Sequence, residues 1–179
     1  GLGIPAEPLF RSKDVNIDTP SPLPTDDHRP TSLVVDDDTE VLRFLRLILQ
    51  PSYQVVTQSS AIAAIAWLSG ATPDLIVSDV MMVGMDGYEF CSRLKKDVTY
   101  CHLPIVLLTA KVSIEERIHG LNVGADAYVT KPFAPDYLKA LIGSLLDNRS
   151  RLRNLLTSST SVRDVRVEPM QEGGVEVNP

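Results

Sequence analysis

The chain has 179 residues, which is enough for one domain of ordinary size with tails. Hydrophobic residues make up 44% and charged residues 22%, a composition that excludes a disordered or collagen-like chain. The net charge of -6 argues against direct binding of nucleic acid by this chain, because that function requires a cationic face.

Residues 1–30 are expected to form a flexible, Pro-rich linker. Six of the 13 prolines lie there, and the stretch has neither sustained periodicity nor the apolar segment of a signal peptide. Gly1 to Ala6 fits the G-x-G-x-x-A dinucleotide fingerprint, but no strand precedes it and Pro5 disrupts the turn, so we reject that interpretation. Because the chain begins at Gly1, we expect it to be a fragment of a longer protein.

From residue 31 onwards, short apolar runs alternate with helical patterns. The runs cover 33–35, 53–57, 75–77, 105–108 and 127–129, and the helical patterns cover 41–49, 61–68, 87–96, 113–121 and 136–156. Runs without in–out alternation are typical of strands buried on both faces, so the pattern predicts an α/β fold with one doubly wound parallel sheet. All the runs are far shorter than the roughly 20 residues of a membrane span.

Polar side chains follow four of the expected strands. They are Asp36, Asp37 and Asp38, then Asp79, then Thr109, then Lys131. The carboxyl ends of parallel strands meet at one edge, so we expect these side chains to lie together. Clustered carboxylates repel one another unless a cation lies among them, and Mg²⁺ prefers such oxygen ligands. With a lysine and a threonine beside it, this set suits the charge of a phosphoryl group in transfer.

Four motifs resemble the receiver domain of two-component response regulators. They are Leu33 to Asp37, Asp79 to Gly87, Leu107 to Ala110 and Gly124 to Phe133. The resemblance covers residues 31–147 and implies a flavodoxin-like, five-stranded sheet of order 2-1-3-4-5. It also implies a phosphorelay switch in the cytoplasm, whose phosphodonor is a histidine kinase, in the same chain or a separate one.

The resemblance implies Asp79 as the phosphoacceptor and Mg²⁺ as the cofactor. The implied Mg²⁺ ligands are the carboxylates of Asp36, Asp37 and Asp79 and the backbone carbonyl of Met81. Asp36 to Asp38 could instead be only a helix N-cap run, with Asp38 or Thr39 as the cap, but the metal interpretation is favoured because Asp79 and Lys131 are in register with it. A haloacid-dehalogenase-like phosphatase is disfavoured, because such enzymes carry a second aspartate where Met81 stands.

The remaining implied roles concern the phosphate and the conformational switch. Thr109 and Lys131 are implied phosphate contacts, and the Lys131–Pro132 bond is often cis in the family. Thr109 and Tyr128 are the implied switch: phosphorylation draws Thr109 inward, Tyr128 follows, and the helix 4–strand 5–helix 5 face repacks to control an output domain. Tyr128 could also be plain core. We expect slow autodephosphorylation rather than turnover of an external substrate; a degenerate receiver that only binds partners is the alternative.

One position departs from the family pattern: Val83 stands where a proline is usual. Valine leaves the loop a freer backbone and an extra N–H, so we expect altered loop stiffness without an effect on the chemistry. The two cysteines, Cys91 and Cys101, are too few for a disulfide framework and fit a reducing compartment.

The last helix is expected to extend beyond the domain. Leucines recur in a heptad pattern, at 138, 141, 145, 152 and 155, with Asn148 between them. Residues 148–156 would form an overhang. Its arginines, Arg149 among them, either solvate a fraying helix end, or the overhang pairs with a second copy in a weak parallel dimer. The helix 4–strand 5–helix 5 face is the other expected dimer surface. Residues 157–179 are expected to be a flexible tail or linker, and the linkers resemble those of hybrid regulators with a preceding sensor kinase and a following AraC-type DNA-binding domain.

Overall fold

The computed structural model describes residue 3 and residues 28–110 and 113–160, so most of the expected linker and most of the expected tail lie outside the described residues. The described residues form a parallel sheet of β1 (Thr31–Val35), β2 (Gln54–Gln58), β3 (Leu75–Asp79), β4 (Ile105–Thr109) and β5 (Ala127–Thr130). The strand order is β2-β1-β3-β4-β5, which confirms the expected topology.

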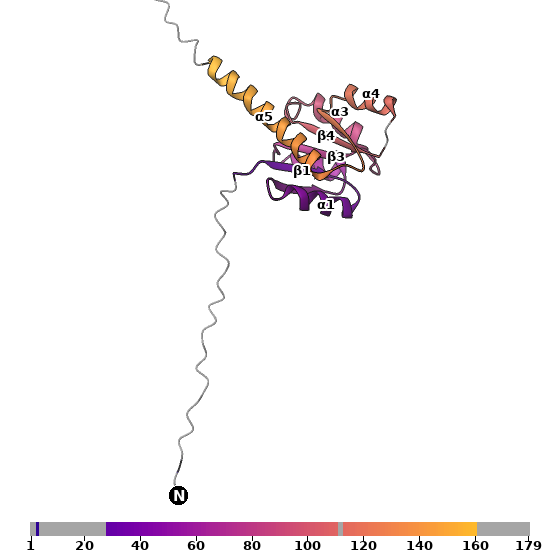
Figure 1. Ribbon diagram of the computed structural model, residues 1–179, viewed down its shortest axis with the longest axis vertical. Coiled ribbons are helices and arrows are strands. Elements are labelled where there is room, and N and C mark those ends of the chain that lie inside the picture. Colours follow the sequence, from indigo (N-terminus) through magenta and orange to yellow (C-terminus); the bar gives the residue numbers. More distant parts are fainter. Residues whose placement is uncertain (1–2, 4–27, 111–112, 161–179) are drawn as a thin grey trace, which may run out of the picture.

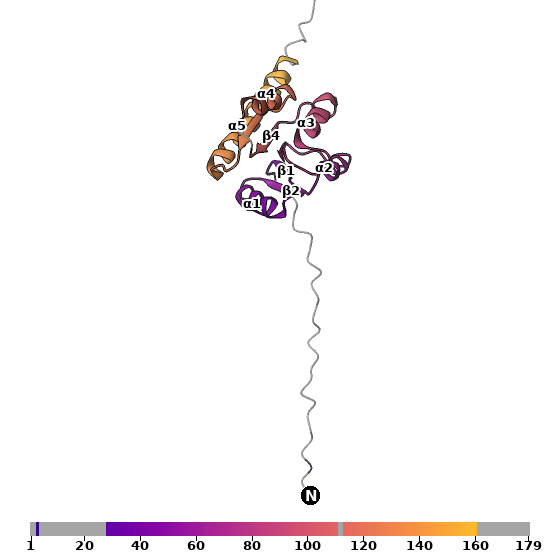
Figure 2. The same ribbon diagram turned by 90° about the vertical axis from the view of Figure 1, so that its right-hand side faces the viewer.

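Five helices alternate with the strands: α1 (Thr39–Leu49), α2 (Ala61–Leu68), α3 (Gly87–Lys96), α4 (Ile114–Asn122) and α5 (Pro135–Thr160). Helices α1 and α5 cover one face of the sheet, and α2 and α3 cover the other (Figure 2). Strands β3 and β4 are buried along their whole length, as their continuous apolar runs predict, whereas the edge strand β2 is half-buried.

Side-chain caps fix where the helices begin. The Asp38 carboxylate accepts from the backbone N–H groups of Glu40 and Val41 and so caps α1. Asp86 caps α3, and Ser113 caps α4 as the sequence predicts. The capping alternative is thus correct for Asp38, whereas Asp36 and Asp37 are left for other contacts.

Two apolar clusters fill the layers on either side of the sheet. One joins the sheet to α2 and α3 and includes Phe90 and Cys91; the other joins it to α1 and α5 and includes Leu45 and Leu138. No helix in the described ranges is long and apolar enough to cross a membrane.

Helix α5 is longer than the sequence pattern predicts and projects from the domain (Figure 1). It begins at Pro135 and ends at Thr160, four residues past the expected end. Its first leucines do not form a free heptad stripe: Leu138 and Ile142 are buried, and Leu141 and Leu145 pack against the same core. The domain itself therefore uses the first half of the heptad pattern.

The overhang is tied back to the domain by one arginine. Arg149 is half-buried and donates to the backbone carbonyl of Asp74 at 2.8 Å. The interpretation that this arginine solvates a fraying helix end is therefore wrong. Leu152, Leu155 and Leu156 are exposed.

Candidate functional site

Three carboxylates meet at the carboxyl edge of the sheet. One oxygen from each of Asp36, Asp37 and Asp79 lies within 4.8 Å of the others. Asp36 directly follows β1 and Asp79 ends β3, and the two strands are paired with Val35 opposite Ser78. This register explains why aspartates 43 positions apart become neighbours. Asp36 and Asp79 are buried and Asp37 is exposed, so the cluster opens to solvent on the Asp37 side.

Lys131 supplies the positive charge of the cluster. Its ammonium donates to Asp79 at 2.7 Å and lies 3.3 Å from a carboxylate oxygen of Asp36. It follows β5, and its backbone N–H donates to the carbonyl of Thr109, so β4 and β5 aim it together. The Lys131–Pro132 peptide bond is cis, as the resemblance implies.

Burial and repulsion both act on these charges. Burial raises the pKa of Asp36, and the nearby charge of Asp79 raises it further, although the Asp38 backbone N–H and Lys131 oppose this. For Lys131, burial on its own would lower the pKa, but the hydrogen bond and charge of Asp79, with those of Asp36, outweigh it and raise the pKa. The ammonium is therefore held charged, and the carboxylates still carry excess negative charge.

The donor set fits a hard divalent cation. Three carboxylate oxygens within 4.8 Å of one another are the ligand type that Mg²⁺ prefers, and the exposed side at Asp37 leaves room for the waters it keeps. One lysine cannot neutralise three carboxylates, so the cluster gains from a further positive charge. The backbone carbonyl of Met81, the fourth expected ligand, is on the loop that directly follows Asp79.

A glycine allows α3 to pack against the backbone of the central aspartate. A Cβ added at Gly87 would lie 2.2 Å from the Asp79 carbonyl oxygen and 2.8 Å from the Cα of Val80. The Gly87 N–H donates to the Val80 carbonyl at 2.9 Å. Only glycine permits this approach, which explains why a glycine directly follows the cap residue Asp86 at the start of α3.

Thr109 ends β4 and is fully buried, one residue past the partner of Asp79 in the β3–β4 register. It thus lies at the edge that carries the carboxylates, as predicted.

Tyr128 lies on β5 opposite Leu107, is half-buried and packs against the core under α3. Its ring fills the space beside α4, because a Cβ on Gly120 would lie 2.7 Å from it. The alternative that Tyr128 is core is thus partly correct.

The hydroxyl of Tyr128 belongs to a network that the sequence did not reveal. It lies 2.6 Å from the hydroxyl of Tyr88, which donates to the Glu116 carboxylate at 2.7 Å. A phenol has one proton, so Tyr128 is the donor to Tyr88. Burial, together with these two partners, raises the pKa of Tyr88. The network joins α3, α4 and β5, and His119 of α4 packs edge-on against the Tyr88 ring.

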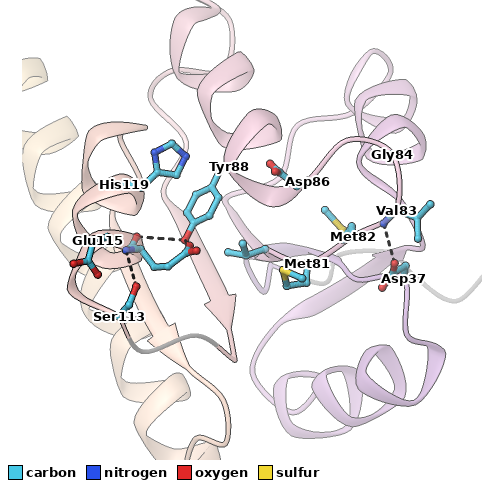
Figure 3. A pocket seen from close by; sticks show the side chains of 12 residues that line it. Asp37, Met81, Met82, Val83, Gly84, Asp86, Tyr88, Ser113, Glu115 and His119 are labelled. Carbon is cyan, nitrogen blue, oxygen red and sulfur yellow. Dashed lines mark hydrogen bonds between the residues drawn. The ribbon is translucent and has the colours of Figure 1, made fainter.

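A cavity of about 800 Å³ separates this network from the carboxylates. Figure 3 shows Tyr88 and His119 at one end of it, and Asp37 and Val83 at the other. The Val83 backbone N–H donates to the Asp37 carboxylate at 3.0 Å. The extra N–H of Val83 expected from the sequence therefore contacts a member of the acidic cluster, and the expectation that the chemistry is unaffected stays a prediction.

Comparisons with known proteins agree with this geometry. The family model for the response regulator receiver domain matches residues 32–143. The chain is 40% identical over 136 residues to the Cyanophora paradoxa protein named "Probable transcriptional regulator ycf27". This match covers 75% of the chain and 55% of that protein. It is 35% identical over 131 residues to "Histidine kinase P4" of Formosa agariphila, covering 73% of the chain but 10% of the kinase.

The fold also matches solved structures. The chemotaxis protein CheY4 of Vibrio cholerae superposes with a TM-score of 0.62 at 32% identity, over 65% of this chain and 98% of that one. The chain therefore spans a whole receiver structure but only part of the longer curated relatives. The family match, which covers well over half of the chain, and the geometry of the site agree: the chain belongs to the response regulator receiver domain family.

Proposed function

We propose that this domain accepts a phosphoryl group on Asp79 from the phosphohistidine of a histidine kinase. The observation that carries the proposal is the contact of Asp79 with Lys131 at 2.7 Å inside a cluster of three carboxylates. The family shown above supports the same reading. The product is an aspartyl phosphate, formed as the Asp79 carboxylate oxygen attacks phosphorus and the donor imidazole leaves.

Each residue of the edge has a proposed part in this transfer. Asp36, Asp37, Asp79 and the Met81 carbonyl hold Mg²⁺, which when bound neutralises charge on the phosphoryl oxygens. Lys131 gives up its bond to Asp79 and pairs with a phosphoryl oxygen, so its charge stays compensated throughout. The buried Thr109 hydroxyl donates to another phosphoryl oxygen. The same edge is proposed to hydrolyse the acyl phosphate slowly, which makes the domain a timed switch rather than a turnover enzyme.

The switch is proposed to act through Tyr128. A phosphoryl group would offer the Thr109 hydroxyl a charged acceptor, and a contact that is stronger in the phosphorylated state shifts the population towards an inward Tyr128. Such a movement requires the Tyr128 bond to Tyr88 to break, which would disconnect β5 from the Tyr88–Glu116 pair that joins α3 and α4. The α4–β5–α5 face would then change shape and control an output domain.

The output is proposed to be transcriptional, and the kinase is proposed to lie in the same polypeptide or in a separate one. The likeness to a protein named as a transcriptional regulator supports the first statement. The likeness to a segment of a histidine kinase supports a receiver joined to its kinase. A cytoplasmic location is part of the proposal, and two free cysteines are compatible with its reducing conditions.

A homodimer is proposed through one of two surfaces. Three apolar residues of α4 are exposed, namely Ile114, Ile118 and Leu121. The end of α5 exposes a second apolar set, Leu152, Leu155 and Leu156. Most leucines of the heptad pattern pack in the domain core, so the exposed set at the end of α5 is short. The α4–β5–α5 face is therefore the better supported dimer surface.

Phosphoryl uptake tests the proposed function. The chain is incubated with a small acyl phosphate donor and Mg²⁺, and uptake is followed by intact mass. The wild type should gain one phosphoryl group, and Asp79→Asn should gain none. Asp147→Asn, which changes an exposed aspartate of α5, is the matched control and should behave as wild type. Uptake by Asp79→Asn at the wild-type rate would overturn the assignment.

A further inference from the structure

The loop from Val80 to Asp86 is anchored on both sides of an exposed tip. Val80, Met82 and Met85 are buried in the core under α3, whereas the Val83 side chain is 87% exposed. Gly84 follows with a φ of +81°, a conformation that side chains rarely adopt. The chain therefore turns sharply at the tip, and the Val83 side chain contributes nothing to packing.

What the tip does contribute is a backbone donor. The Val83 N–H donates to one carboxylate oxygen of Asp37 at 3.0 Å, and Figure 3 shows this bond between two residues that line the cavity. Asp37 is the exposed member of the acidic cluster, so packing does not restrict its side chain. A carboxylate offers two oxygens, and the bond occupies one side of one of them. The group therefore keeps a free oxygen for a cation.

The same bond connects two groups that are distant in the chain. Asp37 follows β1, whereas Val83 is two residues past Met81, whose carbonyl is the proposed backbone ligand of Mg²⁺. A loop held against Asp37 fixes the side-chain ligand and the backbone ligand relative to each other before the cation arrives. Ligands that are ordered in advance bind more tightly, because less conformational entropy is lost on binding.

We propose that Val83 is a positioning residue for the cation site: its backbone N–H latches Asp37 and the β3–α3 loop together and strengthens Mg²⁺ binding. The inference rests on the proposed function, since it concerns the same site. It also gives a physical role to the departure from proline, because proline has no N–H and cannot form the latch.

The test compares Val83→Pro with Val83→Ala in the full chain. Both remove an exposed side chain, and Ala keeps the donor. Within the described residues no non-glycine residue has a positive φ, so the proline ring does not require the backbone to be reversed. Calorimetric titration with MgCl₂ should show a Kd about two- to tenfold weaker for Val83→Pro, which is the effect of ordering one side chain. Val83→Ala should stay within about twofold of wild type. Equal or tighter binding by Val83→Pro would overturn the proposal.

Amide hydrogen exchange gives a second readout that does not require the proline substitution. The Val83 amide should exchange slowly without Mg²⁺, and faster in Asp37→Asn, whose amide oxygen is a weaker acceptor than a carboxylate. Equal, fast exchange in both proteins would refute the latch. If the wild type binds no Mg²⁺ but the Val83 amide is protected, the proposed cation site fails while the latch stands, so the two claims fail separately.

Discussion

Replacement of Lys131 by methionine removes the only ammonium that contacts the acidic cluster in the described part of the chain. Methionine keeps the length of the aliphatic stem, so packing changes little. The change leaves the buried carboxylates of Asp36 and Asp79 facing each other without a counter-charge. We expect a lower free energy of unfolding in the absence of Mg²⁺.

The structure sets the size of the loss. Loss of one partner from a buried ion pair costs about 3–5 kcal/mol. The Lys131 side chain is 26% exposed, so water reaches the site, and we expect a loss below that range, about 2–3 kcal/mol, in urea unfolding with EDTA. Mg²⁺ bound to the same carboxylates compensates their charge, so saturating MgCl₂ should restore most of the loss.

Lys139→Met is the matched control. Lys139 pairs with Asp136 at 2.8 Å, a similar distance, but on the exposed surface of α5. Its loss should have no measurable effect on unfolding, with or without Mg²⁺, because exposed pairs contribute little. If Lys131→Met were as stable as Lys139→Met in EDTA, Lys131 would not be compensating the cluster and the charge argument would be refuted.

Three further predictions concern other parts of the domain. Tyr88→Phe removes the centre of the hydroxyl network and should lower the free energy of unfolding in urea by about 1–2 kcal/mol. In a Tyr128→Phe background the additional loss should be smaller, and full additivity of the two losses would contradict the network. Burial raises the pKa of the Cys91 thiol from 9.0 to about 11, so the folded state keeps a proton that the unfolded state loses. The contribution of Cys91 to the free energy of unfolding should therefore fall as the pH rises from 9.0 towards 11, by up to about 3 kcal/mol. Cys91→Ala should remove this contribution and leave that of other groups, such as Tyr88, in place. In sedimentation with beryllium fluoride, Ile118→Asp should weaken a dimer more than Leu152→Asp, and a strict monomer in every case would exclude both surfaces.

The fold and the edge residues could be predicted because both follow from local sequence. Buried strands appear as continuous apolar runs, and polar residues directly after them must meet at the carboxyl edge of a parallel sheet. The contact of Asp36 with Asp79 follows from that rule alone. The sequence left Asp38 and Thr39 as possible caps of α1, and only the backbone geometry at the start of the helix shows that Asp38 is the cap.

The contacts that escaped prediction join segments far apart in the chain with no periodic signal. Tyr88 and Glu116 meet across 28 positions, and Arg149 reaches the carbonyl of Asp74 across 75. A tyrosine on a helix and an arginine on an overhang have many possible partners, so spacing alone does not select one. The extra N–H of Val83 could be predicted from the missing proline, but its acceptor could not, because it depends on how the loop turns at Gly84.

The most direct test of the account is to locate the phosphoryl group chemically. The chain is phosphorylated with a small acyl phosphate and Mg²⁺, then treated with borohydride, which reduces an aspartyl phosphate to homoserine, and mapped by peptide mass spectrometry. The account predicts homoserine at position 79 in the Mg²⁺ sample and none in the EDTA sample. Reduction at a different carboxylate, or equal labelling of position 79 without Mg²⁺, would contradict the claim that Asp79 accepts the phosphoryl group within a cation-dependent acidic site.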